Sequence, residues 1–334
     1  MKSSNDHLWK IAAEDEYDSL LKNKTWTLVQ LPPGRSFIKS KWIFKIKRTV
    51  RGEDPRFKAR LVTKGFSQCG GIDYTETYAP VAKHDTLRII LSLVASHNLD
   101  MKQVDIKTAF LYGVLAEEIY LQQPEGFIVP GQENLVCRLH KCLYGLKQAS
   151  RVWNRHFDHF LKNFGLTSRE ADPCLYFRRT QDELTIVTIW VDDGLICSSN
   201  GDTVTGIINY LSKHFDMRSS PANIFVGMSI SRDRVNRTLY VSQPEYTKKI
   251  LRRFHVDHCH PKSLPADPGQ RLCKNQDNST ENVRVPFKEA IGSLMYLMLS
   301  TRPDIAFSLN QVSQFSENPK KEHWEAVKRM LAYL

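Results

Sequence analysis

The feature that most constrains this sequence is an apolar stretch, residues 187–196 (VTIWVDDGLI), that contains two adjacent carboxylates. An Asp-Gly pair between apolar runs is typical of a hairpin turn, so Asp193 and Gly194 could mark a turn and nothing more. A turn requires only one Asp, however, and Asp192 directly follows Trp190 and Val191, where an unpaired buried charge would cost several kcal/mol. We therefore expect positive charge close to these carboxylates.

A third carboxylate occurs upstream in a similar context. Asp105 lies between Val104 and Ile106 in a second apolar stretch, and the following KTAFLYG is compatible with a helix. A single Asp at a strand end is usually a helix cap. Together, Asp105, Asp192 and Asp193 can instead hold two Mg²⁺ ions, because Mg²⁺ prefers oxygen ligands. Two ions about 3.5 to 4 Å apart suit nucleotidyl transfer, in which a 3′-hydroxyl attacks as an oxygen leaves in line.

Charge and composition fit a protein that binds a polyanion. The 334 residues carry a formal net charge of +11, and the pI is near 9.2. Nucleic acid matches this charge better than a membrane surface does. The sequence contains no run of 18 apolar residues and no apolar core of a signal peptide, so we expect an intracellular protein without a membrane partner. The seven cysteines form no CxxC pair, as expected of reduced thiols.

Two consecutive segments, residues 39–48 and 56–62, alternate charged and apolar residues with the period of a strand. They predict a hairpin with one apolar face. The other face carries cations without an intervening acid: Lys39, Lys41, Lys45, Lys47, Arg56, Lys58 and Arg60. A solvated surface hairpin is one explanation, since lysines also prevent edge pairing. We favour a surface that contacts phosphates.

Several helices follow from the 3.6-residue apolar period. Residues 84–99 and 150–166 each carry one apolar stripe, the second ending at Gly165. Ser242 and Glu245 form a capping box with Pro244 in the first turn, which predicts the start of another helix. Three further helical segments are expected after Pro286.

The polar, proline-rich residues 255–285 form the predicted boundary before these last segments. This stretch contains five potential zinc ligands: His255, His258, Cys259, His260 and Cys273. Structural zinc sites usually pair their ligands as two closely spaced couples, and a second couple is missing here. A loop is therefore the favoured interpretation.

From about Trp26 to the C-terminus, the sequence resembles the reverse transcriptase of copia-type long-terminal-repeat retrotransposons. The blocks that carry the resemblance follow the order of that family: residues 57–82, 103–113, 117–127, 136–153, 190–196, 225–231 and 289–310. The resemblance implies an α+β right-hand polymerase with fingers, a palm built on an antiparallel sheet, and a thumb, followed by a helical connection segment. It also implies RNA-directed DNA synthesis from a primer with two Mg²⁺ ions, for which Mn²⁺ can substitute.

The resemblance also implies an organisation of the chain. We expect a helical lead-in over residues 1–25, the reverse transcriptase domain over 26–254, a polar linker loop over 255–285 and a helical thumb or connection segment over 286–334. An RNase H domain would begin where this chain ends, so we expect it to be absent. The expected partners are an RNA template, a DNA or RNA primer and dNTPs, with self-association or association with other Pol products as further options. The expected location is cytoplasmic, with virus-like particles as one option.

Site roles are implied residue by residue. Asp105, Asp192 and Asp193 would be the catalytic metal ligands, with the carbonyl of Ile106 beside them. Lys58 and Arg60 would hold the triphosphate, and Phe110 would be the aromatic gate beneath the sugar. The motif that packs against the incoming nucleotide and template base matches Tyr144, Gly145, Leu146, Lys147 and Gln148. The primer grip matches Phe225, Val226, Gly227 and Met228, and the expected phosphate contacts are Lys41, Lys45, Lys47 and Arg56.

Two residues depart from the family pattern: Trp190 replaces the usual Tyr before the paired aspartates, and Ser150 replaces a Pro at the start of a helix. Two alternative functions remain open. A decayed or domesticated nucleic-acid-binding protein is disfavoured by the three intact aspartates. A two-metal nuclease is disfavoured by the basic hairpin and by Phe110, because cleavage needs no sugar gate.

Overall fold

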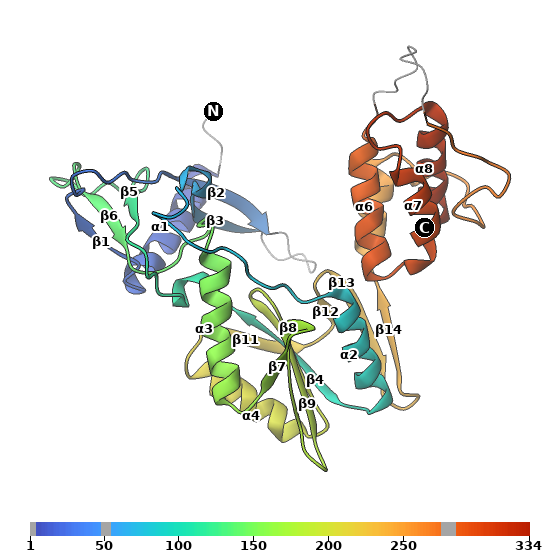
Figure 1. Cartoon of the computed structure of the whole chain (residues 1–334), viewed down its shortest axis with the longest axis horizontal. Helices are drawn as coiled ribbons and strands as arrows, with labels where there is room; N and C mark the ends of the chain where they lie inside the picture. Colours follow the sequence, from blue (N-terminus) through green and yellow to red (C-terminus); the bar gives the residue numbers. More distant parts are fainter. Residues whose placement is uncertain (1–4, 48–54, 275–284) are drawn as a thin grey trace. The chain divides into compact units, whose positions relative to one another are not determined.

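The computed structural model describes residues 5–47, 55–274 and 285–334. Packing divides the chain into two compact units, Met1–Ala82 with Lys102–Ser220, and Lys83–Met101 with Pro221–Leu334. Helices are mixed with antiparallel strand pairs (Figure 1), which confirms the predicted mixed α and β class. The predicted domain boundaries at residues 26, 255 and 286 stay predictions.

The centre of the first unit is a six-stranded sheet in the order β11-β4-β10-β9-β8-β7. Its strands are β4 (Asp100–Ile106), β7 (Thr167–Arg169), β8 (Asp172–Arg179), β9 (Leu184–Trp190), β10 (Asp193–Ser198) and β11 (Met217–Pro221). Strands β9 and β10 pair antiparallel with Trp190 opposite Asp193. The loop between them therefore consists of Val191 and Asp192. The simple hairpin interpretation, which placed the turn at Asp193 and Gly194, was wrong because both residues already pair in β10.

Helices α3 (Ala149–Asn163) and α4 (Gly201–Ser212) pack against this sheet (Figure 1). Their apolar stripes join the strands in one core, which includes Trp153, Phe157, Leu161, Val187, Ile196, Ile207 and Leu211. Each such side chain contributes about 1.5–3 kcal/mol when it is fully buried. The helix predicted over residues 150–166 is confirmed, and it ends before Gly165, which has a φ of +89°.

The remaining elements of the first unit surround a second core. They are α1 (Asp6–Lys22), β1 (Trp26–Val29), β2 (Ser40–Lys47), β3 (Arg56–Thr63), η1 (Gly65–Ser67), η2 (Ala109–Tyr112), β5 (Tyr120–Gln122) and β6 (Val136–Leu139). The predicted basic hairpin is confirmed, since β2 pairs antiparallel with β3. Helix α1 covers its apolar face, where the Trp9 ring lies 5.3 Å from Phe44 and 4.5 Å from Phe57.

The second unit combines helices with a three-stranded antiparallel sheet in the order β12-β13-β14. Its elements are α2 (His84–Ser96), β12 (Ile224–Phe225), β13 (Met228–Asp233), β14 (Thr238–Ser242), α5 (Pro244–Arg253), α6 (Phe287–Ser300), η3 (Pro303–Ile305), α7 (Ala306–Ser313) and α8 (Lys321–Tyr333). The three helical segments expected after Pro286 are confirmed, and they form one core with α5.

Helix α5 begins at Pro244 as predicted, but its N-cap is Gln243, and this cap makes no side-chain hydrogen bond. The capping box with Ser242 and Glu245 was therefore wrong. The physical reason is that Ser242 is the last residue of β14 and pairs with Ser229, so its backbone belongs to the sheet.

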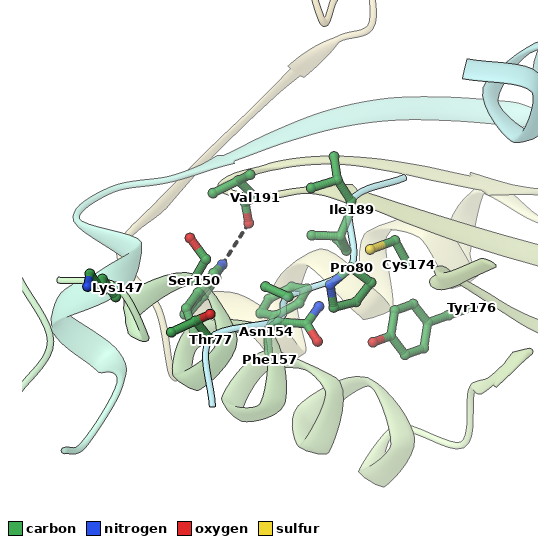
Figure 2. Close-up of a pocket in the computed structure, with 13 residues that line it drawn as sticks. Thr77, Pro80, Lys147, Ser150, Asn154, Phe157, Cys174, Tyr176, Ile189 and Val191 are labelled. Carbon is green, nitrogen blue, oxygen red and sulfur yellow. Dashed lines mark hydrogen bonds between the residues drawn. The ribbon is translucent and has the colours of Figure 1, made fainter. Parts of the chain in front are cut away.

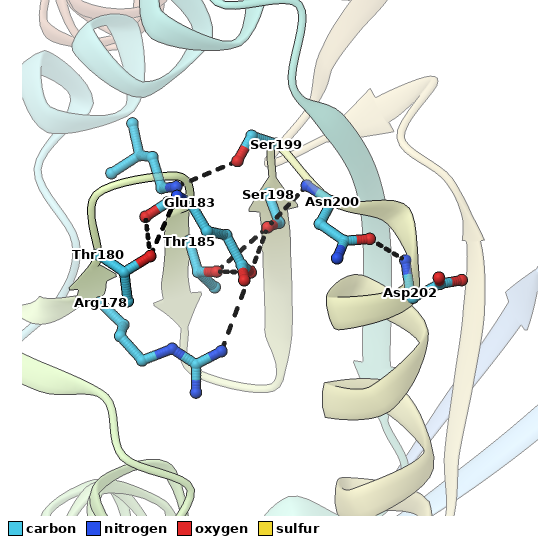
Figure 3. A network of polar contacts seen from close by, with 9 residues as sticks. Arg178, Thr180, Glu183, Thr185, Ser198, Ser199, Asn200 and Asp202 are labelled. Atoms are coloured by element: carbon cyan, nitrogen blue, oxygen red, sulfur yellow. Dashed lines mark hydrogen bonds and ion pairs between the residues drawn. The ribbon is translucent and has the colours of Figure 1, made fainter.

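A polar network closes the end of the β9–β10 hairpin that lies opposite the turn (Figure 3). The Glu183 Oε1 atom accepts hydrogen bonds from the buried hydroxyls of Thr185 at 2.9 Å and Ser198 at 3.0 Å. Burial acts to raise the pKa of the Glu183 carboxyl, but hydrogen bonds from Thr203, Thr185 and Ser198 outweigh it and lower the pKa. The ionised carboxylate therefore stabilises the folded hairpin.

We expect Glu183→Gln to lower the free energy of unfolding by about 1–2 kcal/mol at pH 7, because it weakens hydrogen bonds to a charged acceptor. Since the folded pKa is lowered, the carboxylate stabilises the fold above the reference pKa of 4.5. This stability is lost as the pH falls through the folded pKa, so the difference between parent and variant should shrink in acid. Urea unfolding at pH 7 and below pH 4.5 measures both effects. Asp182→Asn, at the exposed neighbouring acid, is the control, and an equal loss in both variants would contradict the network's role.

Candidate active site

A polar cavity of about 630 Å³ lies in the first unit, where the end of β4 meets the β9–β10 turn. Four carboxylates line it, Glu16, Asp105, Asp192 and Asp193, together with four cations, Lys58, Arg60, Lys107 and Arg218. The structure thus brings together the three predicted catalytic carboxylates, the carbonyl-bearing Ile106 and both predicted triphosphate-binding cations. Charges of both signs in one concave site suit a ligand that carries both phosphates and cations.

The backbone of the β9–β10 turn is strained. Val191 has a φ of +60°, which a β-branched residue rarely adopts and which costs about 1–3 kcal/mol. Two hydrogen bonds hold it. The Val191 carbonyl accepts the Trp153 indole N–H at 2.6 Å, drawn as the dashed line at the labelled Val191 in Figure 2, and the Asp192 carbonyl accepts the Ile106 N–H at 2.9 Å. These contacts fix the backbone from which the Asp192 side chain extends.

Gly194 allows β10 to approach β4. A Cβ at this position would lie 2.7 Å from Val104 Cγ2 and 3.0 Å from Ile189 Cδ1, closer than side chains normally pack. The glycine that suggested a turn in the sequence therefore serves strand packing. It keeps β10, which begins with Asp193, next to the strand that carries Asp105.

The surroundings of Asp192 disfavour its ionised form. Burial raises the pKa of its carboxyl and the nearby Asp105 carboxylate raises it further, against hydrogen bonding to the backbone and the charges of Arg60 and Lys58. Within the part of the chain that the structure describes, neither Asp105 nor Asp192 forms an ion pair. A positive ligand between them would relieve their mutual repulsion.

Lys107 is already neutralised. Its Nζ atom lies 2.8 Å and 2.9 Å from the two carboxylate oxygens of Asp216, and its backbone N–H donates to the Asp216 carbonyl at 2.9 Å. This pair ties the residue after Ile106 to the start of β11. Lys107 thus contributes less positive charge to the cavity than its position suggests.

An aromatic and a cationic side chain pack together on the cavity wall. The guanidinium carbon of Arg60 lies 4.8 Å from the centroid of the Tyr144 ring, and the Phe110 ring lies 4.8 Å from Tyr144 edge to face. Tyr144 therefore supports Arg60 from one side. Phe110 is half-buried behind Tyr144 and is not among the lining residues, so its predicted role beneath the sugar stays a prediction.

The edge of β3 that does not pair with β2 is anchored through two backbone N–H groups. The Leu61 N–H donates to Glu16 Oε1 at 3.4 Å, and the Thr63 N–H donates to the Tyr144 carbonyl at 2.8 Å. Gly145, with a φ of +94°, makes the second contact possible, because a Cβ there would lie 2.2 Å from the Thr63 carbonyl oxygen. The basic hairpin is thereby fixed to the segment that precedes α3.

Lys147 and Gln148, predicted to contact the nucleotide, are engaged elsewhere. Lys147 Nζ donates to the Tyr74 hydroxyl at 3.0 Å, and Gln148 Nε2 donates to the Asp73 carbonyl at 2.8 Å. Gln148 is buried, and its Oε1 accepts from Gln68 Nε2 at 3.1 Å. Their side chains therefore hold the 68–74 segment against the start of α3, and their predicted role stays a prediction.

Like charges face each other across the basic hairpin. Lys45 lies opposite Lys58. Directly opposed like charges destabilise an antiparallel pair unless a counter-charge is present. Lys41 and Lys45 are exposed, so a polyanion can reach them.

The predicted primer-grip residues lie in the second unit. They form the tight turn between β12 and β13, with φ values of +48° at Val226 and +75° at Gly227, and with the side chains of Phe225 and Met228 buried. Tyr296 of α6 donates its hydroxyl to the Val226 carbonyl at 2.9 Å. A Cβ on Gly227 would lie 2.5 Å from that hydroxyl oxygen, so the turn requires glycine for close approach.

In the described ranges, no group of three or more His, Cys, Asp or Glu side chains is arranged to hold a metal ion. This applies to the three aspartates as they stand, and to the His and Cys residues of the 255–274 segment. None of the helices in those ranges is long and apolar enough to span a bilayer.

Several lining residues were missed in the sequence. Glu16 lies on α1, whose acids all resemble solvated surface charges in the sequence, so no local pattern singles it out. Arg218, Ser219 and Ser220 sit on β11, a short strand without alternation. Trp153 was assigned to the core, correctly, but its indole N–H also reaches the turn. Only the tertiary contacts reveal these roles.

Comparison with known proteins agrees with the geometry. Residues 23–268 match the family described as reverse transcriptase (RNA-dependent DNA polymerase). The chain is 46% identical over 330 residues to the retrovirus-related Pol polyprotein from transposon TNT 1-94 of Nicotiana tabacum, covering 97% of this chain and 25% of that protein. It is 34% identical over 336 residues to the corresponding polyprotein from transposon RE1 of Arabidopsis thaliana, covering 100% of this chain and 23% of that protein. The chain thus spans about a quarter of the length of these relatives.

We expect Gly145→Ala to lower the free energy of unfolding by about 3 kcal/mol or more, because the Cβ adds a clash with Thr63 to the strain of a positive φ. Urea unfolding measures the loss. Gly131→Ala is the matched control, since Gly131 has a φ of +78° with nothing within 4 Å of its Cβ position, and it should cost about 1 kcal/mol. Equal losses in the two variants would show that the Gly145–Thr63 approach does not matter.

Proposed function

We propose that this chain, which belongs to the reverse transcriptase (RNA-dependent DNA polymerase) family, extends a primer 3′-hydroxyl with dNTPs on an RNA or DNA template. One observation carries the proposal: Asp105 and Asp192, from two separate strand ends, line the same cavity as Arg60. Among the described residues none of the three forms an ion pair. Carboxylates and a cation left unneutralised in one cavity suit a nucleoside triphosphate with its metal ions.

The donor set suits divalent metal ions by its ligand chemistry, although the three aspartates as they stand do not converge on one point. Asp105, Asp192, Asp193 and the Ile106 carbonyl offer the hard oxygen ligands that Mg²⁺ prefers. The pKa of the Asp192 carboxyl is raised first by burial and then by repulsion from Asp105, and a bound cation would favour the ionised carboxylate against both. Mn²⁺ takes similar ligands. Bound there, the metal ions would supply charge stabilisation for the attacking and leaving oxygens.

The other residues of the cavity would bind and orient the substrate. Arg60 and Lys58 would hold the triphosphate, with Arg60 kept in place by the Tyr144 ring. The hydrogen bonds from Trp153 and Ile106 would keep Asp192 fixed while the nucleotide is exchanged. Such preorganisation raises the rate because little rearrangement is left for the transition state.

The right-hand arrangement is part of the proposal. The six-stranded sheet with α3 and α4 corresponds to a palm, and the β2–β3 hairpin with its basic face corresponds to fingers that contact template phosphates. In the second unit, the turn over residues 225–228 would be the primer grip, and the helices would form the thumb and connection. The cross-strand pair of like charge, Lys45 with Lys58, supports the assignment of the hairpin, because a bound phosphate backbone would neutralise it.

Primer extension on an RNA template with one dNTP omitted tests the function. Extension that halts at the missing base is templated synthesis. Degradation of the nucleic acid would instead identify a nuclease, and binding without either would identify a non-catalytic binding protein.

Asp192→Asn should reduce the extension rate at least about 100-fold and leave template affinity nearly unchanged. The reason is that the lost charge acts on the metal ions and the transition state, whereas Lys and Arg contacts supply most of the affinity. Extension rates and fluorescence anisotropy with a labelled template measure the two quantities. Asp182→Asn is the control, and extension by the Asp192 variant within threefold of the parent would refute the site.

Phe110→Val should raise the incorporation of ribonucleotides relative to deoxyribonucleotides, because a smaller side chain would leave room for the 2′-hydroxyl. Single-nucleotide incorporation with paired dNTP and NTP substrates measures the ratio. The half-buried packing of Phe110 on Tyr144 offers the competing explanation. General loss of activity with unchanged selectivity would assign Phe110 to the core alone.

A further inference from the structure

Glu16 brings a fourth carboxylate to the cavity, and it comes from outside the β4 and β9–β10 strand ends. It lies on α1, its side chain is half-buried, and its Oε1 accepts the Leu61 N–H at 3.4 Å. Burial raises the pKa of the Glu16 carboxyl, and the charges of Lys58 and Arg60 act in the opposite direction. Glu16 therefore lies within the electrostatic range of both proposed triphosphate-binding cations.

The geometry of β3 explains how Glu16 reaches this position. Leu61 and Thr63 point their N–H groups away from β2, and the acceptors are Glu16 and the Tyr144 carbonyl, respectively. Arg60 directly precedes Leu61 in β3 and is supported by the Tyr144 ring. In the part of the chain that the structure describes, neither Glu16 nor Arg60 forms an ion pair, so the carboxylate acts on the Arg60 guanidinium through space and does not engage it directly.

We propose, resting on the polymerase function above, that Glu16 is a specificity-determining residue that weakens the hold of the cavity on polyphosphate. A fixed negative charge beside Lys58 and Arg60 lowers the positive potential that a triphosphate or pyrophosphate meets. An incoming dNTP also gains contacts through its base and sugar. Pyrophosphate has only the cations and the metal ions, so its release benefits most from the opposing carboxylate.

Three variants separate charge from packing. Glu16→Gln removes the charge and keeps an oxygen that can accept the Leu61 N–H. Glu16→Met fills a similar volume without an acceptor, so a change shared by both neutral variants comes from the charge. Asp15→Asn removes the same charge from the exposed neighbouring position of α1 and is the control.

Two measurements on the full chain test the proposal. The first is the inhibition constant of inorganic pyrophosphate, together with the KM for dNTP, in primer extension. The second is direct calorimetric binding of pyrophosphate with Mg²⁺, which requires no turnover. We expect Glu16→Gln and Glu16→Met to bind pyrophosphate about threefold to tenfold more tightly than the parent, with a smaller fall in KM and no change in Asp15→Asn.

Unchanged or weaker pyrophosphate binding in both neutral variants would overturn the proposal, and so would an equal gain in Asp15→Asn. A gain confined to one neutral variant would also overturn it, because packing would then be the cause. The calorimetric measurement separates this proposal from the polymerase function. A parent chain that binds pyrophosphate without extending a primer would refute the function and still allow the role of Glu16 to be decided.

Discussion

The hydrogen bond between the Trp153 indole and the Val191 carbonyl joins the main core to the candidate active site. Trp153 is buried in the core between α3 and the sheet, and its N–H is the polar group that this core directs at the strained turn. A left-handed conformation at a valine persists only where the surroundings enforce it. Here the enforcement comes from α3 on one side and from the Ile106 N–H of β4 on the other. The position of Asp192 thus depends on the packing of the whole sheet.

The same helix also orders the other wall of the cavity. Residues 144–148 lead directly into α3, and their backbone and side chains hold both the edge of β3 and the 68–74 segment. Gly145 and Gly65 permit this contact, since a Cβ on Gly65 would lie 2.0 Å from the Gly145 carbonyl oxygen. The cavity has carboxylates from the sheet on one side and cations from the hairpin on the other. Both sides are held in place by α3 or by the residues that lead into it. Hydrogen bonds and glycine contacts, more than ion pairs, fix the distance between the opposite charges.

How much the sequence predicts depends on whether the information is local. The basic hairpin and helices α2 and α3 were predicted because the alternation of a strand and the 3.6-residue period of a helix are visible in consecutive residues. The capping box failed because Ser242 also belongs to β14, and pairing in a sheet outweighs a local cap. Gly194 was misinterpreted for a similar reason. Its lack of a side chain lets Val104 pack close to it, and Val104 is 90 residues away along the chain. The family resemblance predicted one shared site for Asp105, Asp192 and Asp193, and all three line the same cavity, whereas their spacing in the sequence could only suggest this.

The position of Glu16 in the cavity could not be predicted from the residues around it in the sequence. In the sequence it is one acid among several on a surface helix, and nothing distinguishes it from Glu14 or Asp15. Its contribution arises because β3 is an edge strand of a two-stranded sheet, so its outward N–H groups need acceptors from elsewhere. When a carboxylate accepts a hydrogen bond from a backbone N–H at the edge of a strand, it also brings a negative charge to that edge. Here the carboxylate of Glu16 brings its charge into a cavity lined by Lys58 and Arg60. A requirement of the backbone therefore sets part of the electrostatics of the cavity, and this is the physical basis of the role proposed for Glu16.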